Sequence, residues 1–172
     1  LLFQPEAETG EKQSKDNKKT TPNCKKNDKN RIQMGSGGAK MASKLTKKRK
    51  FPIIIDEEGE NVSRLRNIIN HNISANFFGK LYNENKTFCL KLFKHYIFSL
   101  SKTLKSLGIN INTIPVLDVL RNNTNSVIGN RSFSKDKKIV KELGTLMIKY
   151  LQFYKISGVI KHIPGHGATV TD

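Results

Sequence analysis

Three short runs of apolar residues divide the chain into repeating units. They occupy residues 51–56 (FPIIID), 112–118 (NTIPVLD) and 158–162 (GVIKH). Continuous, β-branched runs of this length are typical of strands buried on both faces of a parallel sheet. Each run becomes polar only at its carboxyl end, where the first two finish in an aspartate and the third in Lys-His. The pattern predicts three buried parallel strands whose carboxyl ends carry ionisable side chains.

Two long segments between these runs have apolar residues at every third or fourth position. One spans residues 85–107, and Gly108 is placed to end that helix as its C′ residue. The other spans residues 135–156, with Ser134 placed as its N-cap and Gly158 placed to close it. Aromatic residues at this spacing are more often core than a cofactor-binding box. We therefore expect a buried stripe formed by Phe88, Leu92, Phe93, Tyr96, Ile97, Leu100, Leu104, Ile139, Val140, Leu143, Met147, Tyr150, Leu151 and Tyr154.

Strands that alternate with helices indicate an α/β protein with a parallel sheet. A weaker helical pattern at about residues 75–80 adds to the first connection. Two architectures fit, a (β/α)₈ barrel and a doubly wound sheet, and both gather the ligand at the carboxyl ends of the strands. A barrel takes about 250 residues, so three strands amount to roughly half of one. No GxGxxG follows a strand, and GSGGAK at residues 35–40 has no strand before it, which argues against nucleotide binding.

Residues 1–50 differ in composition from the rest of the chain. They contain 14 Lys or Arg against 5 Asp or Glu, so they supply +9 (14 minus 5) of the total charge of +17. Such a composition cannot bury enough apolar surface to offset the entropy of the chain. We therefore expect a disordered basic tail over residues 1–50 and a folded domain over residues 51–172 that is truncated at its carboxyl end.

The basic charge raises one alternative function, a non-enzymatic protein that binds nucleic acid or anionic surfaces through its Lys-rich tail. No zinc-finger, RNP-type or KH signature supports specific nucleic-acid binding. Cys24 and Cys89 form neither a CxxC pair nor a disulfide framework. No apolar run reaches the roughly 18 residues that span a bilayer, and the N-terminus has no signal-peptide pattern. We expect a cytoplasmic protein with no membrane partner.

Polar side chains follow each predicted strand, and the carboxyl ends of parallel strands meet at one edge of the sheet. Two of the runs end in acids, and an arginine follows each of them in the next loop. Carboxylates beside Arg, Lys and His donors suit a ligand with many hydroxyls, such as a sugar, and they also suit a phosphate. The candidate residues are Asp56, Glu57, Glu58, Arg64, Asp118, Arg131, Lys161, His162, His166 and Asp172.

His162 and His166 raise the alternative of a metal site. On a helix, residues at i and i+4 share a face, but Pro164 and Gly165 lie between the two histidines and break any helix. Two histidines without a third placed ligand are weak evidence for a metal. We therefore expect no metal, a proton-transfer or hydrogen-bonding role for at least one histidine, and a structural role in the turn for the other.

Three blocks of sequence resemble glycoside hydrolase family 3. KHIPGHG, in residues 161–167, resembles the family's Lys-His-Phe-Pro-Gly-His-Gly motif. IIIDEEGENVSRL, in residues 53–65, resembles the first site segment, in which an Asp precedes a Glu-Gly pair and an Arg follows. IPVLDV followed by IGNRSFSKD resembles the next strand and its Arg-bearing loop. The blocks keep the family's order from about residue 51 to 172, and the third is most similar to single-domain bacterial β-N-acetylglucosaminidases. Residues 1–50 resemble nothing in the family.

The resemblance implies part of a (β/α)₈ barrel that hydrolyses terminal β-linked N-acetylglucosamine with retention. Asp118 and His166 would support the sugar-binding residues from behind. The acid/base of this subgroup is a histidine oriented by an aspartate two residues before it, and Asp172 matches that aspartate. The histidine and the nucleophilic aspartate would lie beyond residue 172. The residues that would bind the sugar hydroxyls are Asp56, Arg64, Arg131, Lys161 and His162.

The resemblance also implies an N-acetylglucosamine-containing glycoside or muropeptide as substrate, in peptidoglycan or amino-sugar recycling. It implies no cofactor, and a monomer for the full-length protein. Because both reacting groups of the enzyme would lie outside these 172 residues, we expect this chain alone to turn over nothing measurable.

Two segments depart from the family pattern, at three positions in all. Gly59-Glu60-Asn61 stands where the family has Gly-Gly-Arg, so Glu60 replaces a turn glycine suited to positive φ and an arginine is lost. Ile163 replaces a phenylalanine, which is a mild apolar exchange. The first departure bears on the geometry of the loop after the first strand.

Overall fold

Three short parallel strands form one sheet in chain order. The computed structural model describes residues 41, 44–45, 51–69, 73–121 and 126–166 of the 172. Strand β1 (Ile54–Ile55) pairs with β2 (Ile111–Asn112), and β2 pairs with β3 (Ser157–Gly158). A further parallel bridge joins Val116 to Lys161. The prediction of a parallel α/β arrangement is confirmed, although the regular ladders are shorter than the apolar runs.

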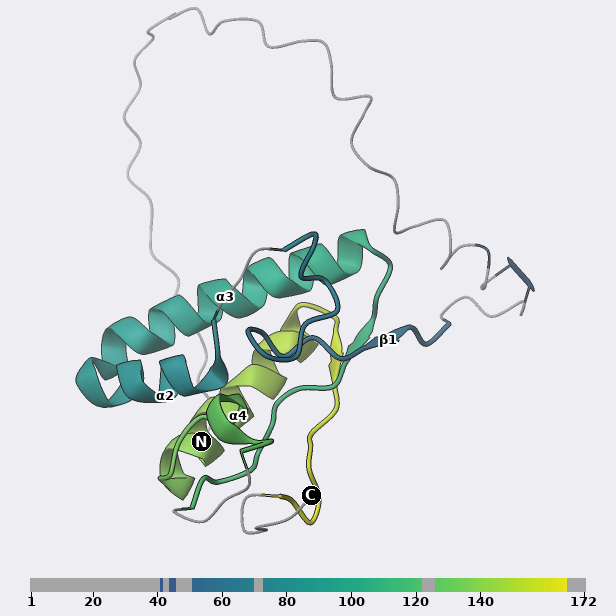
Figure 1. The fold of residues 1–172 in the computed structure, drawn as a ribbon. Helices are drawn as coiled ribbons and strands as arrows, with labels where there is room; N and C mark the ends of the chain where they lie inside the picture. Colours follow the sequence, from purple (N-terminus) through teal and green to yellow (C-terminus); the bar gives the residue numbers. More distant parts are fainter. Residues whose placement is uncertain (1–40, 42–43, 46–50, 70–72, 122–125, 167–172) are drawn as a thin grey trace, which may run out of the picture. The chain divides into compact units, whose positions relative to one another are not determined.

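Helices connect the strands, as Figure 1 shows. Between β1 and β2 lie α2 (Ala75–Glu84) and α3 (Lys86–Ser106). Between β2 and β3 lie the 3₁₀ turn η2 (Gly129–Arg131) and α4 (Lys137–Phe153). The three predicted helical segments are therefore confirmed. In the described ranges, no helix combines the length and the apolar character needed to cross a membrane.

The helices bury one continuous apolar core, in which α3 supplies Phe93 and Ile97 and α4 supplies Leu143 and Leu151. Most of the predicted stripe is confirmed, but Phe88 is 54% exposed, while its neighbour Cys89 in the same first turn of α3 is fully buried. Phe88 therefore lies on the solvent side of the helix. Burial of the strands on both faces is wrong for the described residues. Ile54 is 63% exposed while its neighbour Ile55 packs on the core, since successive side chains of a strand point to opposite faces.

The end of α3 follows the predicted signal. Gly108 has φ +78°, its N–H donates to the carbonyl of Lys105 (3.0 Å), and the N–H of Ile109 donates to that of Leu104 (2.9 Å). These two bonds form a Schellman motif, in which a residue with positive φ satisfies carbonyls that the helix leaves unpaired. Gly108 as the C′ residue is therefore confirmed.

Both end residues predicted for α4 are wrong. Asp136, not Ser134, is the N-cap, because its carboxylate accepts from the N–H of Lys138 (2.8 Å) while the Ser134 hydroxyl accepts from the N–H of Asp136 (3.0 Å). Lys155 takes the positive φ of +62° after the helix. Gly158 lies instead in β3, where a Cβ would come within 3.0 Å of the Ile114 carbonyl oxygen. Close packing of the strand, not a helix cap, requires that glycine.

Two asparagine side chains extend the pairing of β1 with β2 at both ends. Asn110 accepts from the N–H of Ile53 (2.8 Å) and donates to the carbonyl of Phe51 (2.7 Å). Asn112 accepts from the N–H of Glu57 (3.1 Å) and donates to the carbonyl of the same residue (2.9 Å). A carboxamide offers the same donor and acceptor as a peptide group, so it replaces a ladder partner where the backbones diverge.

We expect Asn112→Ala to lower the free energy of unfolding by about 2–4 kcal/mol, because it leaves a buried N–H and a buried carbonyl of Glu57 without their partner. Asn110→Ala is the matched control, and its partners are only part-buried, so water can replace the lost amide. Urea unfolding of the two variants measures the difference. Equal losses in both variants would contradict this account.

Candidate functional site

A network of charged side chains joins the carboxyl ends of the first and third strands. Lys161, which follows β3, places Nζ 2.5 Å from Oδ1 of Asp56 and 2.5 Å from Oε1 of Glu58. The hydroxyl of Thr113, which follows β2, donates to Asp56 (2.6 Å) and accepts from Lys161 (3.2 Å). Burial raises the pKa of the Asp56 carboxyl, but the hydrogen bonds from Lys161 and Thr113 outweigh it and hold the pKa below its usual range. Three strands thus contribute to one ionic cluster.

Arg131 enters the same cluster from η2. Its Nε and Nη2 donate to the two carboxylate oxygens of Glu58 at 2.8 and 2.9 Å. This two-point geometry fixes the plane of the guanidinium as well as its position. The hydrogen bond with Glu58 raises the pKa of Arg131, and the charges of Asp56 and Asp118 add to this effect. Arg131 therefore lies in the field of all three acids.

The sequence identified Glu58 only as one of several acids at a strand end. It did not predict that Glu58 would pair with two cations. Its side chain is 6% exposed, and it accepts from both Lys161 and Arg131. Its position two residues after Asp56 was the available signal, since residues i and i+2 of an extended segment point to the same side.

Arg64 lies at the edge of the cluster with its side chain 68% exposed and Nη2 3.9 Å from Asp56. Its backbone is held from inside the protein, because Oε2 of the fully buried Glu57 accepts from the N–H groups of Arg64 (2.8 Å) and Leu65 (2.9 Å). Glu57 is in turn bound through its backbone to Asn112. The loop after β1 is therefore anchored, while the guanidinium reaches into solvent.

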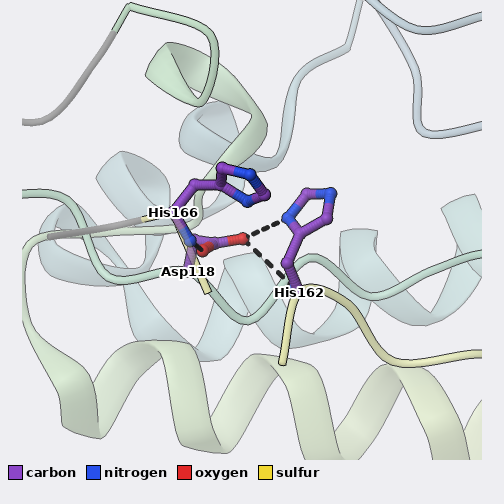
Figure 2. A group of neighbouring side chains, drawn as sticks. All are labelled: Asp118, His162 and His166. Atoms are coloured by element: carbon purple, nitrogen blue, oxygen red, sulfur yellow. Dashed lines mark hydrogen bonds and ion pairs between the residues drawn. The ribbon is translucent and has the colours of Figure 1, made fainter. Parts of the chain in front are cut away.

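Asp118 forms hydrogen bonds with both His162 and His166, as Figure 2 shows. Oδ2 lies 2.6 Å from Nδ1 of His162 and also accepts from its backbone N–H (3.3 Å), while Oδ1 accepts from the N–H of His166 (2.5 Å). The Asp118 side chain is fully buried. Burial raises its pKa, but the hydrogen bonds from the His162 ring and from the backbones of His166 and His162 outweigh it, so the pKa lies below its usual range.

The turn between the histidines brings their rings together. Their centroids are 4.8 Å apart with an interplanar angle of 84°. Pro164 and Gly165 break any helix here, as expected, and the turn brings the two rings together by another route. Gly165 has φ +110°, and a Cβ there would lie 2.9 Å from Oδ1 of Asp118. The glycine thus allows the turn to close onto the carboxylate.

The unusual loop after β1 has its own contacts. The positive φ falls on Gly59 (+128°), where a Cβ would lie 2.2 Å from the Ile73 carbonyl oxygen, and not on Glu60. Asn130, the residue before Arg131, donates to the carboxylate of Glu60 (2.8 Å) and accepts a short hydrogen bond from the amide of Asn61. Glu60 and Asn61 therefore bind this loop to the loop of η2, and the glycine that the turn requires is retained.

The structure brings together five of the predicted site residues in one region. Asp56, Arg64, Arg131 and Lys161 meet around the first strand end, and His162 follows Lys161 and rests on Asp118. Asp172 lies outside the described residues. The cluster offers fixed cations, a part-exposed carboxylate and an imidazole, which are suited to a polyhydroxylated ligand.

Comparison with known families identifies the fold. Residues 23–172 match the family "Glycosyl hydrolase family 3 N terminal domain". The chain belongs to this family. The match begins inside the segment expected to be a basic tail. The family's fold places the three parallel strands and their helices in a (β/α)₈ barrel, of which the chain forms a part, and not in a doubly wound sheet.

Relatives of the chain are β-hexosaminidases. β-Hexosaminidase A of Pseudoalteromonas piscicida is 34% identical over 126 residues, covering 70% of this chain and 20% of that protein. The β-hexosaminidase of Nitrosomonas eutropha is 33% identical over 120 residues, covering 70% of this chain and 34% of that protein. The chain therefore spans about a third or less of the length of these curated relatives.

Solved structures agree with this family. NagZ from Neisseria gonorrhoeae, solved in complex with N-trifluoroacetyl-D-glucosamine, is 26% identical with a TM-score of 0.64 over 76% of this chain and 39% of that one. The same enzyme has been solved in complex with a zinc ion, with the same identity and TM-score. At this level of identity, the likeness extends to sequence as well as fold.

We expect Asp118→Asn to lower the free energy of unfolding by about 1–3 kcal/mol at pH 7, because the buried charge-assisted hydrogen bonds weaken. The pKa of Asp118 is lower in the folded than in the unfolded chain, so this stabilisation is full above the unfolded pKa of about 3.9 and is lost as the pH falls through the folded value. Denaturant unfolding at pH 7 and pH 3 should therefore show a smaller difference between wild type and variant at pH 3.

Asp136→Asn is the control for this prediction, because Asn caps a helix about as well as Asp. It should change the free energy of unfolding by less than about 0.5 kcal/mol at pH 7. A difference between Asp118→Asn and wild type that stayed constant from pH 7 to pH 3 would refute the role assigned to the Asp118 charge.

Proposed function

We propose that this chain carries the sugar-binding part of a glycoside hydrolase that releases terminal β-linked N-acetylglucosamine with retention. The observation that carries the proposal is the cluster of Lys161, Asp56, Glu58 and Arg131 at the carboxyl ends of the strands. Membership of glycosyl hydrolase family 3 and the relatives named β-hexosaminidase support it. A nucleic-acid-binding role through the Lys-rich tail is not favoured, since that family match covers most of the chain.

The cluster suits a sugar because each hydroxyl is both a donor and an acceptor. Asp56, whose side chain is 36% exposed, can accept from one hydroxyl or from a vicinal pair. Lys161 and Arg131 supply positive charge, and Glu58 holds both in place before any ligand arrives. Donors that are already oriented lose less conformational entropy on binding than flexible surface cations do.

His162 completes the proposed sugar contacts. Asp118 contacts Nδ1, so a neutral ring that donates there presents Nε2 as an acceptor on the other side. The His162 side chain is 26% exposed, which leaves room for a hydroxyl to reach it. Asp118 and His166 then hold the His162 ring and its turn in position, Asp118 by hydrogen bonds and His166 by packing against the ring.

The proposed catalytic groups are an aspartate nucleophile and a histidine acid/base oriented by Asp172. A histidine held by a carboxylate titrates near neutral pH, so it can protonate the leaving oxygen and later deprotonate water. The nucleophile would take up the oxocarbenium-like carbon and then release it to water. The histidine gives one proton to the leaving oxygen in the first step and regains one from water in the second, so the protons balance.

The finer proposals concern the setting of the enzyme. We propose an N-acetylglucosamine-containing glycoside or muropeptide as substrate, action in the cytoplasm, and a monomeric full-length protein. The NagZ relative solved with an N-acetylglucosamine analogue supports the substrate class. We also propose that residues 1–50 form a basic tail outside the barrel part, which spans residues 51–172.

Sugar binding is tested most cleanly at Arg64. Its guanidinium is largely exposed and makes one long contact of 3.9 Å to Asp56, so Arg64→Ala should leave the fold intact. We expect it to weaken binding of N-acetylglucosamine about ten- to a hundredfold, as for loss of a hydrogen bond from a charged group. Isothermal titration calorimetry or NMR titration of the chain measures the change.

Arg66→Ala is the matched control, since Arg66 is also exposed, lies in the same loop and makes a 3.4 Å contact to the Glu60 carbonyl. It should bind N-acetylglucosamine like wild type. Equal weakening in both variants would indicate a general charge effect and would count against the proposed subsite.

The reaction is tested with a chromogenic β-N-acetylglucosaminide. The chain and, where the gene extends beyond residue 172, its longer product are assayed side by side. We expect turnover by the longer product and no measurable turnover by residues 1–172. A longer product that neither hydrolyses the substrate nor binds N-acetylglucosamine would overturn the proposed function.

A further inference from the structure

We propose that Asp118, His162 and His166 form a binding site for a divalent transition-metal ion, with Zn²⁺ the best match, and that this ion competes with the sugar for His162. One nitrogen of each imidazole and one carboxylate oxygen of Asp118 lie within 4.8 Å of one another. The competition rests on the proposed function, because it requires His162 to bind the sugar.

The chemistry of the three groups suits Zn²⁺. Imidazole nitrogen and carboxylate oxygen bind this ion at about 2.0–2.2 Å, which places two ligand atoms of a tetrahedral site roughly 3.3–3.5 Å apart. The observed separations of up to 4.8 Å therefore close by small rotations of the two rings. Two neutral imidazoles and one carboxylate leave one position of a four-coordinate ion for water or another ligand.

The scaffold holds the ligands before any ion binds. The backbone N–H groups of His162 and His166 both donate to Asp118, so the two histidine backbones stay fixed on the carboxylate while the rings turn. Gly165 permits this closure, and a side chain there would meet Asp118 at 2.9 Å. Carboxylates that ligate metals commonly accept hydrogen bonds at the same time, so the existing bonds and a metal are compatible.

A hollow lies beside two of the three proposed ligands, Asp118 and His162. Its volume is about 200 Å³. This volume is several times the roughly 30 Å³ that one water occupies in the liquid, so it accepts a metal ion with bound water. Arg121 also lines the hollow, but it is an exposed residue, and water and salt screen its charge.

Occupation by a metal would change what His162 can do. A ring nitrogen that donates its lone pair to Zn²⁺ no longer accepts from a sugar hydroxyl. The same residue thus serves either ligand and not both, and Zn²⁺ acts as an inhibitor of sugar binding at this site. The sugar correspondingly weakens the metal, because competition is reciprocal.

The test is direct titration of the chain with Zn²⁺ by isothermal titration calorimetry, with Co²⁺ as a second probe whose visible absorption reports four-coordination. We expect one ion per chain, and at least about tenfold weaker binding in His166→Ala and His166→Gln. His95→Ala is the matched control, since His95 is an exposed histidine of α3 outside the cluster, and it should bind like wild type. Far-UV circular dichroism verifies that each variant is folded.

Retention of Zn²⁺ affinity in both His166 variants, or equal loss in His95→Ala, would overturn the metal site. The competition is tested by repeating the Zn²⁺ titration with saturating N-acetylglucosamine, which should weaken Zn²⁺ binding at least about tenfold. Independent binding of the two ligands would overturn the competition. A chain that binds Zn²⁺ through His166 but shows no sugar binding would refute the proposed function while leaving the metal site supported.

Discussion

Glu58 is almost fully buried between Lys161 and Arg131, and the geometry of the whole site depends on this ionic contact. The three side chains come from the ends of β1 and β3 and from the turn before α4, so the contact joins segments up to 103 residues apart (161 minus 58). Removing one partner of a buried pair leaves an uncompensated charge and costs about 3–5 kcal/mol. The network therefore orients the cations and also holds the loops of the site together.

A second buried carboxylate organises the other side of the site. The Asp118 carboxylate accepts from the His162 ring and from the backbone N–H groups of both histidines, and Gly165 allows the turn to reach it. The result is a His162 ring whose orientation is set before a ligand arrives. The same arrangement that prepares a histidine for a sugar hydroxyl is also the arrangement found at zinc sites, where a carboxylate fixes the imidazole. The proposed sugar site and the proposed metal site therefore share one residue, His162.

Much of the fold was accessible from the sequence because its signals are local. The i+3/i+4 spacing located α3 and α4, and Gly108 marked the end of α3 because no other residue adopts positive φ at so little cost. Where two neighbouring residues could both cap a helix, the sequence did not decide between them. Asp136 displaced Ser134 as a cap because both residues can accept from a nearby N–H, and the start of the helix decides which one does. Phe88 fits the apolar spacing but is exposed, while the neighbouring Cys89 is buried on the core side of the same turn.

The sequence by itself determined the parallel α/β plan and the presence of ionisable side chains at the strand ends, among them Asp56, Lys161 and His162, since strand periodicity and strand-end polarity are properties of neighbouring residues. Only the tertiary structure decided which side chains pair. Glu58 takes two cations, Asn112 completes the ladder of β1, and His166 lies beside His162 across a turn that breaks any helix. Such contacts depend on how segments distant in sequence approach one another in space. Their distances are set by the packing of α3 and α4 against the sheet, which no local pattern encodes.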